Sequence, residues 1–401
     1  MRRDQVFGQS TPFGVLYLAW HLAQTVAETF NGLHQSALSL CVQEWDRSFN
    51  QLSLLTRRHR RASSTYMGGA DMRHDLEQQG FEDCELETRG ISVHYLRGPD
   101  CGPALVLIPG QAMTWDSYAR VLPRLASRFR VFAVDVRGHG GSTWTPGEYD
   151  FPTMGEDFAA LLSEVVKSPA IVSGNSSGGL IALWLAANRP DLVAGIVMED
   201  APVFSAEWPR LRDDCYVYQV FQQVSRSLAG PGHRDLAAFF AGLQVPVEHG
   251  QRLWSLPKWL MAPIGWAASV HEALKPGEPV DIPFFPPAMR LIVRSLTSYD
   301  PQFSVAFIDG SACRGFDHAQ ALQHVRCPIL FMHADWFRVG GDGMLVGSVD
   351  DHDVARMLAI VPGLRYRRIH SGHMIHFYSP DQYVEEVLSF AREMARTASD
   401  N

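Results

Sequence analysis

The most constraining feature of the sequence is a turn rich in glycine and serine, SGNSSGG at residues 173–179, which joins two apolar runs. The run before it has the length of a buried strand, and residues 180–188 have the spacing of a buried helix. Gly174 and Gly178 flank Ser176 in the pattern G-x-S-x-G, which in this context predicts a tight, strained turn that exposes the serine hydroxyl. We therefore predict that Ser176 is a nucleophile. The N–H of Ser177, at the start of the helix, would face the same developing negative charge. A turn that merely caps a helix is the alternative.

Strand-like and helix-like patterns alternate on both sides of this turn. Apolar runs suited to buried strands occur at residues 104–108, 130–134, 195–198, 328–332 and 364–369, after a hairpin pattern at 84–96. Such alternation predicts an α/β protein with a mostly parallel sheet flanked by helices. Residues 201–326 break the alternation and are rich in Trp, Phe and Pro, so we interpret them as a mainly helical cap inserted at the carboxyl edge of the sheet. The expected division is an N-terminal extension (1–78), a core in two parts (79–200 and 327–401) and the cap.

Composition narrows the class of protein. Hydrophobic residues make up 46% of the 401 residues and charged residues only 19%, which suits a chain with a large core. The net charge of −8 gives no reason to expect a nucleic-acid partner, and a small ligand is favoured. The six cysteines are scattered, which favours reduced thiols and a cytoplasmic location. The best apolar stretch, residues 13–23, is shorter than the roughly 20 residues that a membrane span needs.

Residues 1–78 show apolar positions at helical spacing followed by a basic run at 57–61. We expect two or three amphipathic helices that pack on the main domain or on a second copy in a homodimer. An arm that touches a membrane surface or another partner is the alternative.

The general base is predicted from its position after the last strand. A serine hydroxyl needs a base that is oriented in turn by a carboxylate. His373 lies on the loop between the last predicted strand and the final helix, where this order of elements places such a base. His370 and His376 flank it, so a metal site of three histidines is an alternative, but no supporting acid or cysteine cluster accompanies them. We expect neither a metal nor a cofactor.

The carboxylate has several candidates. Glu199 and Asp200 end the strand that follows the nucleophile's helix, whereas Asp335 and Asp342 follow the run at 328–332. Asp335 comes too early in its loop for the usual acid. We therefore favour Glu199 and keep Asp200, Asp335 and Asp342 as alternatives.

The second oxyanion donor is expected from the loop after residues 104–108. Gly110 allows a close backbone approach to substrate, and the N–H of Gln111 is the candidate donor. In the cap, Trp208 and Trp259 are the aromatic side chains that we expect to contact substrate, although most cap aromatics would serve only to hold the cap on the core.

Residues 82–396 resemble the α/β-hydrolase superfamily. The resemblance lies in the chain order of the predicted catalytic residues, serine, acid and histidine, and in the segment DVRGHGGS at 135–142. The resemblance does not cover residues 1–78, and Pro109 stands where many members have histidine. Longer stretches are similar to bacterial zearalenone hydrolases, which open a macrocyclic resorcylic lactone: residues 131–146, 174–187, 199–207 and 299–312. The resemblance implies Ser176 as nucleophile, His373 as base and an acid at Glu199 or Asp200.

The expected function is hydrolysis of an ester or lactone of a small hydrophobic substrate, aromatic or macrocyclic, through an acyl-enzyme. Two alternatives remain open at this stage. One is a hydrolase of another bond, such as a linear ester, a carbamate or a carbon–carbon bond. The other is a ligand-binding relative that has lost turnover.

Overall fold

The structure is a computed structural model that describes residues 69–229, 234–247, 252–255, 257–283 and 285–400. Most of the predicted N-terminal extension therefore lies outside the described residues. Its last part is helix α3, Gly69–Gln78, which leads into the first strand. Within the described part of the chain, no helix has the length and apolar character needed to cross a membrane.

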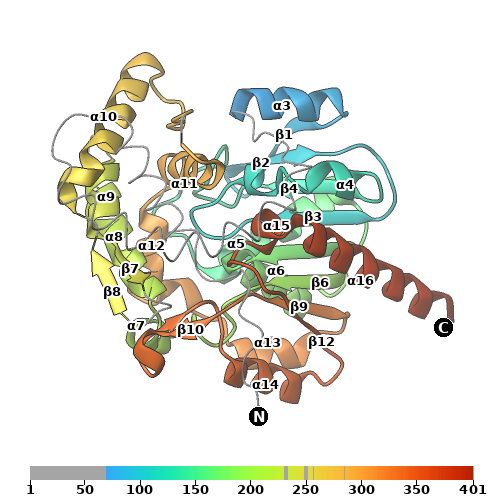
Figure 1. The fold of residues 1–401 in the computed structure, drawn as a ribbon. Helices are drawn as coiled ribbons and strands as arrows, with labels where there is room; N and C mark the ends of the chain where they lie inside the picture. Colours follow the sequence, from blue (N-terminus) through green and yellow to red (C-terminus); the bar gives the residue numbers. More distant parts are fainter. Residues whose placement is uncertain (1–68, 230–233, 248–251, 256, 284, 401) are drawn as a thin grey trace, which may run out of the picture.

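An eight-stranded sheet forms the centre of the molecule (Figure 1), in the order β1-β2-β4-β3-β5-β6-β9-β12. The predicted hairpin of β1 and β2 is present, and β2 also pairs antiparallel with β4, while every other neighbouring pair is parallel. The strands are β1 Glu82–Thr88, β2 Ile91–Arg97, β3 Ala104–Ile108, β4 Arg130–Val134, β5 Ala170–Asn175, β6 Val193–Glu199, β9 Ile329–His333 and β12 Arg365–Arg368.

Both faces of the sheet are covered, which explains why its strands read as continuous apolar runs. Side chains alternate along β3: Leu105 and Leu107 belong to one core cluster, whereas Val106 and Ile108 belong to the other. The first cluster packs under η1, α4, α15 and α16, and the second under α5, α6, α13 and α14. These elements are η1 Trp115–Tyr118, α4 Leu122–Ala126, α5 Phe151–Leu161, η2 Leu162–Val166, α6 Ser177–Asn188, α13 His318–His324, α14 Asp351–Ile360, α15 Ile375–Tyr378 and α16 Pro380–Asp400.

Most of the segment between β6 and β9 forms the cap, seen at the left of Figure 1, whereas its last helix, α13, packs on the core beside α14. The cap is mainly helical, with one small hairpin that the sequence did not predict. A second short hairpin, β10 with β11, follows β9. The cap and hairpin elements are α7 Arg210–Asp214, α8 Val217–Leu228, α9 Leu236–Gly242, β7 Gln244–Val247, β8 Arg252–Ser255, α10 Lys258–Leu274, α11 Pro287–Thr297, α12 Gln302–Ile308, η3 Ser311–Cys313, β10 Phe337–Arg338, η4 Val339–Gly341 and β11 Leu345–Val346.

Candidate active site

Ser176 lies in a strained turn between β5 and α6. Its backbone has φ 52° and ψ −122°, in a region that L-residues rarely occupy. The turn is so tight that a Cβ on Gly174 would lie 2.1 Å from the carbonyl of Gly178, and one on Gly178 would lie 2.3 Å from the carbonyl oxygen of Ile108. Both glycines are thus required by the close approach of backbone to backbone. The turn that the sequence predicted is present, and Ser176 lines a cavity above it.

His373 reaches the same cavity from the loop before α15. Its Nδ1 lies 2.7 Å from Oδ2 of Asp200, whose carboxylate is buried and also accepts the N–H of Ala334 at 3.0 Å. With Nδ1 donating to Asp200, Nε2 is the nitrogen left to accept a proton. Partial desolvation of the ring would lower the pKa of His373, but the hydrogen bond that the ring donates to Asp200, the charge of Asp200 and the charge of Glu199 raise the pKa overall.

Glu199 does not contact His373, which corrects our preferred choice of carboxylate. It is fully buried, and its carboxylate accepts hydrogen bonds from the backbone N–H and from Nδ1 of His376, each at 2.8 Å. Glu199 is the last residue of β6 and still follows the alternation of the strand, whereas Asp200 has a φ of 43° that turns its side chain toward His373. The structure thus places Ser176 and His373 on one cavity and pairs His373 with the alternative acid, Asp200.

The other carboxylate candidates lie elsewhere. Asp335 lines the cavity, but its carboxylate is 3.1 Å from Nδ1 of His370 and 3.4 Å from the guanidinium of Arg368. Asp342 follows η4 and does not line the cavity.

The three neighbouring histidines do not converge on a point. Each ring faces a different carboxylate: His370 faces Asp335, His373 faces Asp200 and His376 faces Glu199. A metal ion needs ligand atoms that meet at one position, so this set does not fit one.

Among the described residues, one other group has the spacing of metal ligands: Asp350, His352 and Asp353. Both of its carboxylates are engaged, because they cap α14 and pair with Arg338 and Arg210.

The proposed oxyanion donors flank Ser176. A Cβ on Gly110 would lie 3.0 Å from the Cβ of Ser176, so the loop after β3 passes directly beside the nucleophile. The side chain of Gln111 donates from Nε2 to the hydroxyls of Tyr299 and Ser304, at 2.9 and 2.8 Å. That contact anchors the loop to the cap. Ser177 is the first residue of α6 and lines the cavity on the other side.

His139 is a supporting residue for this loop that the sequence prediction missed. Its Nε2 accepts the N–H of Ala112 at 3.0 Å, and its Nδ1 donates to the carbonyl of Arg137 at 3.1 Å. Desolvation lowers the pKa of His139 to about 4, so the ring is neutral as this pattern requires. Pro109 stands where a histidine would be usual, and His139 instead holds the loop from another loop through the N–H of Ala112. His139 lies in the segment DVRGHGGS, but the sequence of this segment does not show that the histidine contacts Ala112.

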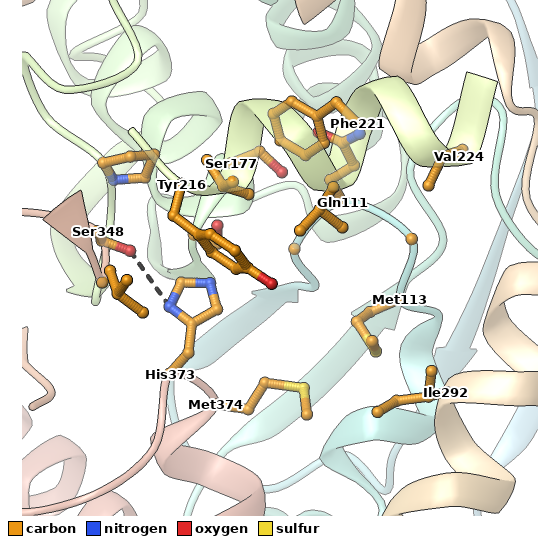
Figure 2. A pocket seen from close by; sticks show the side chains of 18 of the residues that line it. Gln111, Met113, Ser177, Tyr216, Phe221, Val224, Ile292, Ser348, His373 and Met374 are labelled. Atoms are coloured by element: carbon orange, nitrogen blue, oxygen red, sulfur yellow. Dashed lines mark hydrogen bonds between the residues drawn. The ribbon is translucent and has the colours of Figure 1, made fainter. Parts of the chain in front are cut away.

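The cavity has a volume of about 410 Å³ and a polar end and an apolar end. Ser176, His373 and Gln111 lie at the polar end, and Figure 2 shows His373, Gln111, Tyr216 and Met374 around the same space. Ser348 lies beside His373, with its Oγ 3.2 Å from Nδ1. The cap supplies an almost wholly apolar wall: Val217, Val220, Phe221, Val224, Phe239, Phe240, Leu243, Pro246, Met261, Ile264, Met289, Ile292 and Leu296.

Two predicted substrate contacts, Trp208 and Trp259, are not part of the cavity wall, whereas Gly110 is. The indole of Trp208 donates to the carbonyl of Phe307 and stacks against Arg212, so it holds cap elements together. Trp259 is 64% exposed, because α10 turns Met261 and Ile264 toward the cavity and leaves Trp259 on its outer side.

The strained serine turn at the end of β5 and a histidine paired with a buried aspartate line one cavity under the cap, which is the arrangement expected of a serine hydrolase on the α/β-hydrolase fold. The chain belongs to the α/β-hydrolase family: residues 103–243 match the family model described as the alpha/beta hydrolase fold. The chain is 31% identical to a pimeloyl-[acyl-carrier protein] methyl ester esterase of Aeromonas hydrophila, over 52% of this chain and 82% of the esterase.

Other similarities are shorter in sequence or limited to the fold. The chain is 32% identical to the sn-1-specific diacylglycerol lipase ABHD11 of Mus musculus, over 30% of this chain and 40% of the lipase. A solved structure of a hydrolase from Pseudomonas aeruginosa PA01 superposes with a TM-score of 0.54 at 23% identity, covering 77% of this chain and 98% of that one. This last likeness concerns the fold alone.

Proposed function

We propose that this protein is a serine hydrolase that cleaves a carboxylic ester or lactone of an uncharged, hydrophobic substrate through an acyl-enzyme. The observation that carries the proposal is that Ser176 and His373, which is paired with the buried Asp200, line the same largely apolar cavity. The similarity to an ester-cleaving relative over most of that relative's length supports the bond type.

The chemistry begins with proton transfer from Ser176 to His373. As Oγ attacks the substrate carbonyl, Nε2 of His373 takes its proton, and Asp200 stabilises the resulting imidazolium through Nδ1. The backbone N–H groups of Gln111 and Ser177 hold the oxyanion of the tetrahedral intermediate. The alkoxide then leaves with the proton from Nε2. Water, activated by His373, attacks the acyl-enzyme and releases the acid and free Ser176.

The substrate class follows from the cavity wall. Apart from the catalytic end, the wall consists largely of aliphatic and phenyl side chains, which favour an aromatic or macrocyclic group over a charged one. Within this class we propose a zearalenone-type macrocyclic lactone as the specific substrate, supported by the sequence stretches similar to zearalenone hydrolases. In a lactone the leaving alcohol stays tethered to the acyl group, so hydrolysis of the acyl-enzyme must be faster than closure of the ring.

The test is incubation with macrocyclic lactones, linear aryl esters and aryl carbamates, with product masses measured directly. We expect a gain of one water on a macrocyclic lactone, absent with Ser176→Ala. Turnover of linear esters or carbamates alone would limit the function to another bond type. Absence of both turnover and an acyl-enzyme burst on every substrate would contradict an enzyme and favour a ligand-binding relative.

A further inference from the structure

Glu199 and His376 form a buried pair that the proposed chemistry does not use. Their side chains are 0% and 1% exposed, and the two hydrogen bonds from His376 reach the carboxylate from its backbone and its ring. The imidazole also stacks on Tyr118, with ring centroids 4.0 Å apart, and meets the edge of Tyr383. Burial of a polar pair in an apolar layer costs free energy of folding unless its hydrogen bonds compensate the loss of water. The presence of this pair beside the active site therefore needs an explanation.

The geometry defines the charge of this pair. Nε2 of His376 is buried and has no hydrogen-bond partner among the described residues, so a proton there would be unsatisfied. The ring is therefore neutral, with its proton on Nδ1, and donates to Glu199. Glu199 accepts from two N–H groups and donates to none, as expected of an ionised carboxylate. With this assignment of the protons, the pair as a whole has one buried negative charge.

Glu199 is also tied to both halves of the catalytic machinery. Its backbone carbonyl accepts the N–H of Ser176 at 2.9 Å, while its side chain holds the backbone N–H of His376, three residues after His373. Asn175 strengthens this link, because its side-chain amide donates to the carbonyl of His373 at 3.0 Å and to that of Glu199 at 3.3 Å. One residue thus connects the nucleophile's turn to the loop of the base.

We propose that Glu199 is a positioning residue that, with His376, fixes the loop of His373 relative to Ser176 and adds its buried charge to that of Asp200 behind the imidazolium. This inference rests on the proposed function. It explains why an acid ends β6 and a second acid follows it, since each holds a histidine of the same loop: Glu199 holds His376, and Asp200 holds His373.

The electrostatic surroundings of His373 agree with this role. Asp200, directly after β6, and Glu199, at its end, both raise the pKa of His373 against the desolvation of the ring. The neutral hydroxyl of Ser348 lies 3.2 Å from the same nitrogen, Nδ1. Asp335 also lines the cavity, but it faces Arg368 and His370. Removal of the charge of Glu199 should therefore shift the protonation of His373 toward lower pH.

The test compares Glu199→Gln with wild type in the rate at which a fluorophosphonate labels Ser176, measured across pH. We expect labelling to slow about tenfold, which corresponds to the loss of one hydrogen bond to a charged group. We also expect the acidic midpoint of the labelling rate to move to lower pH. The matched control is Asp157→Asn, which alters another buried carboxylate, one bound to Arg137 away from the cavity. Asp157→Asn should reduce thermal stability, while the pH midpoint of Ser176 labelling stays unchanged.

If Glu199→Gln does not fold, two substitutions of His376 decide the question. His376→Asn keeps an N–H donor near the position of Nδ1, whereas His376→Phe keeps only the ring that stacks on Tyr118. We expect slow labelling with Phe and recovery with Asn. Labelling of Glu199→Gln, or of both His376 variants, at the wild-type rate and midpoint would overturn the positioning role. Failure of wild type itself to label would instead contradict the proposed function.

Discussion

The two ends of the cavity are built in different ways. At the catalytic end, each functional side chain is held by hydrogen bonds: His373 by Asp200, the loop of Gln111 by the cap and by His139, and the turn of Ser176 by Glu199. At the cap end, side chains such as Met261, Ile264 and Met289 hold their places by apolar packing alone. Substitutions at the catalytic end should therefore reduce the rate of the reaction. Substitutions at the cap end change the shape of the cavity and so determine which substrate fits.

Asp200→Asn should have the largest effect of any change at the catalytic end that leaves the nucleophile in place. The amide no longer orients His373 or stabilises its imidazolium, so kcat should fall by about 10³ to 10⁴. Steady-state kinetics on a chromogenic ester measures the loss. Asp335→Asn is the matched control, since Asp335 lines the cavity without contacting His373. A larger loss with Asp335→Asn than with Asp200→Asn would refute the assignment.

His139→Ala should have a smaller effect on the same end. It removes the acceptor for the N–H of Ala112 and lets the loop of Gln111 relax, so kcat should fall by about tenfold to a hundredfold, less than complete loss of an oxyanion donor.

The control for this change is His318→Ala. His318 is also fully buried, burial lowers its pKa to about 3, and it accepts the N–H of Phe204 away from the oxyanion loop. Both variants should lose thermal stability, and only His139→Ala should lose kcat at a temperature where both are folded. Equal losses of kcat would mean that His139 only supports the fold.

The pH dependence of kcat/KM should report His373. The base must be neutral to accept the proton of Ser176, and its raised pKa keeps it protonated to a higher pH than free histidine. Activity should therefore fall about tenfold per pH unit below a midpoint that lies above about 6.5. A midpoint at or below the value of free histidine would mean that burial outweighs Asp200 and Glu199.

Changes at the cap end should alter selectivity rather than chemistry. Ile264→Phe adds bulk to the apolar wall, so we expect KM for a macrocyclic lactone to rise about tenfold while kcat for a short ester stays the same. Trp259→Ala, on the exposed side of the same helix, should change neither constant. An effect of Trp259→Ala as large as that of Ile264→Phe would show that the substrate reaches a different face of α10.

The catalytic end could be predicted from the sequence to the extent that it depends on chain order. Ser176 and His373 follow from their places after particular strands, because the ends of parallel strands meet at one edge of the sheet. Chain order placed the acid at the end of β6 but could not separate the neighbours Glu199 and Asp200, and the preference for Glu199 was wrong. The choice depends on the single backbone angle that turns Asp200 toward His373. His139 was missed for a similar reason, since its partner Ala112 is distant in sequence.

The cap end could be predicted only in outline. The break in alternation located it, but α10 is apolar over most of its surface, so periodicity does not show which side faces the cavity. Trp259 was therefore assigned to the wrong side, and Met261 and Ile264 were not predicted as part of the wall. Tryptophan count is a poor guide to substrate contact when both sides of a helix are apolar.

The most direct test of the account is the mass of the intact protein after reaction with a fluorophosphonate, followed by peptide mapping. We predict a single adduct on Ser176 in wild type, no adduct with Ser176→Ala, and an adduct that forms about a thousandfold more slowly with Asp200→Asn. An adduct on another residue, or undiminished ester turnover by Ser176→Ala, would contradict the assignment of Ser176 as the nucleophile.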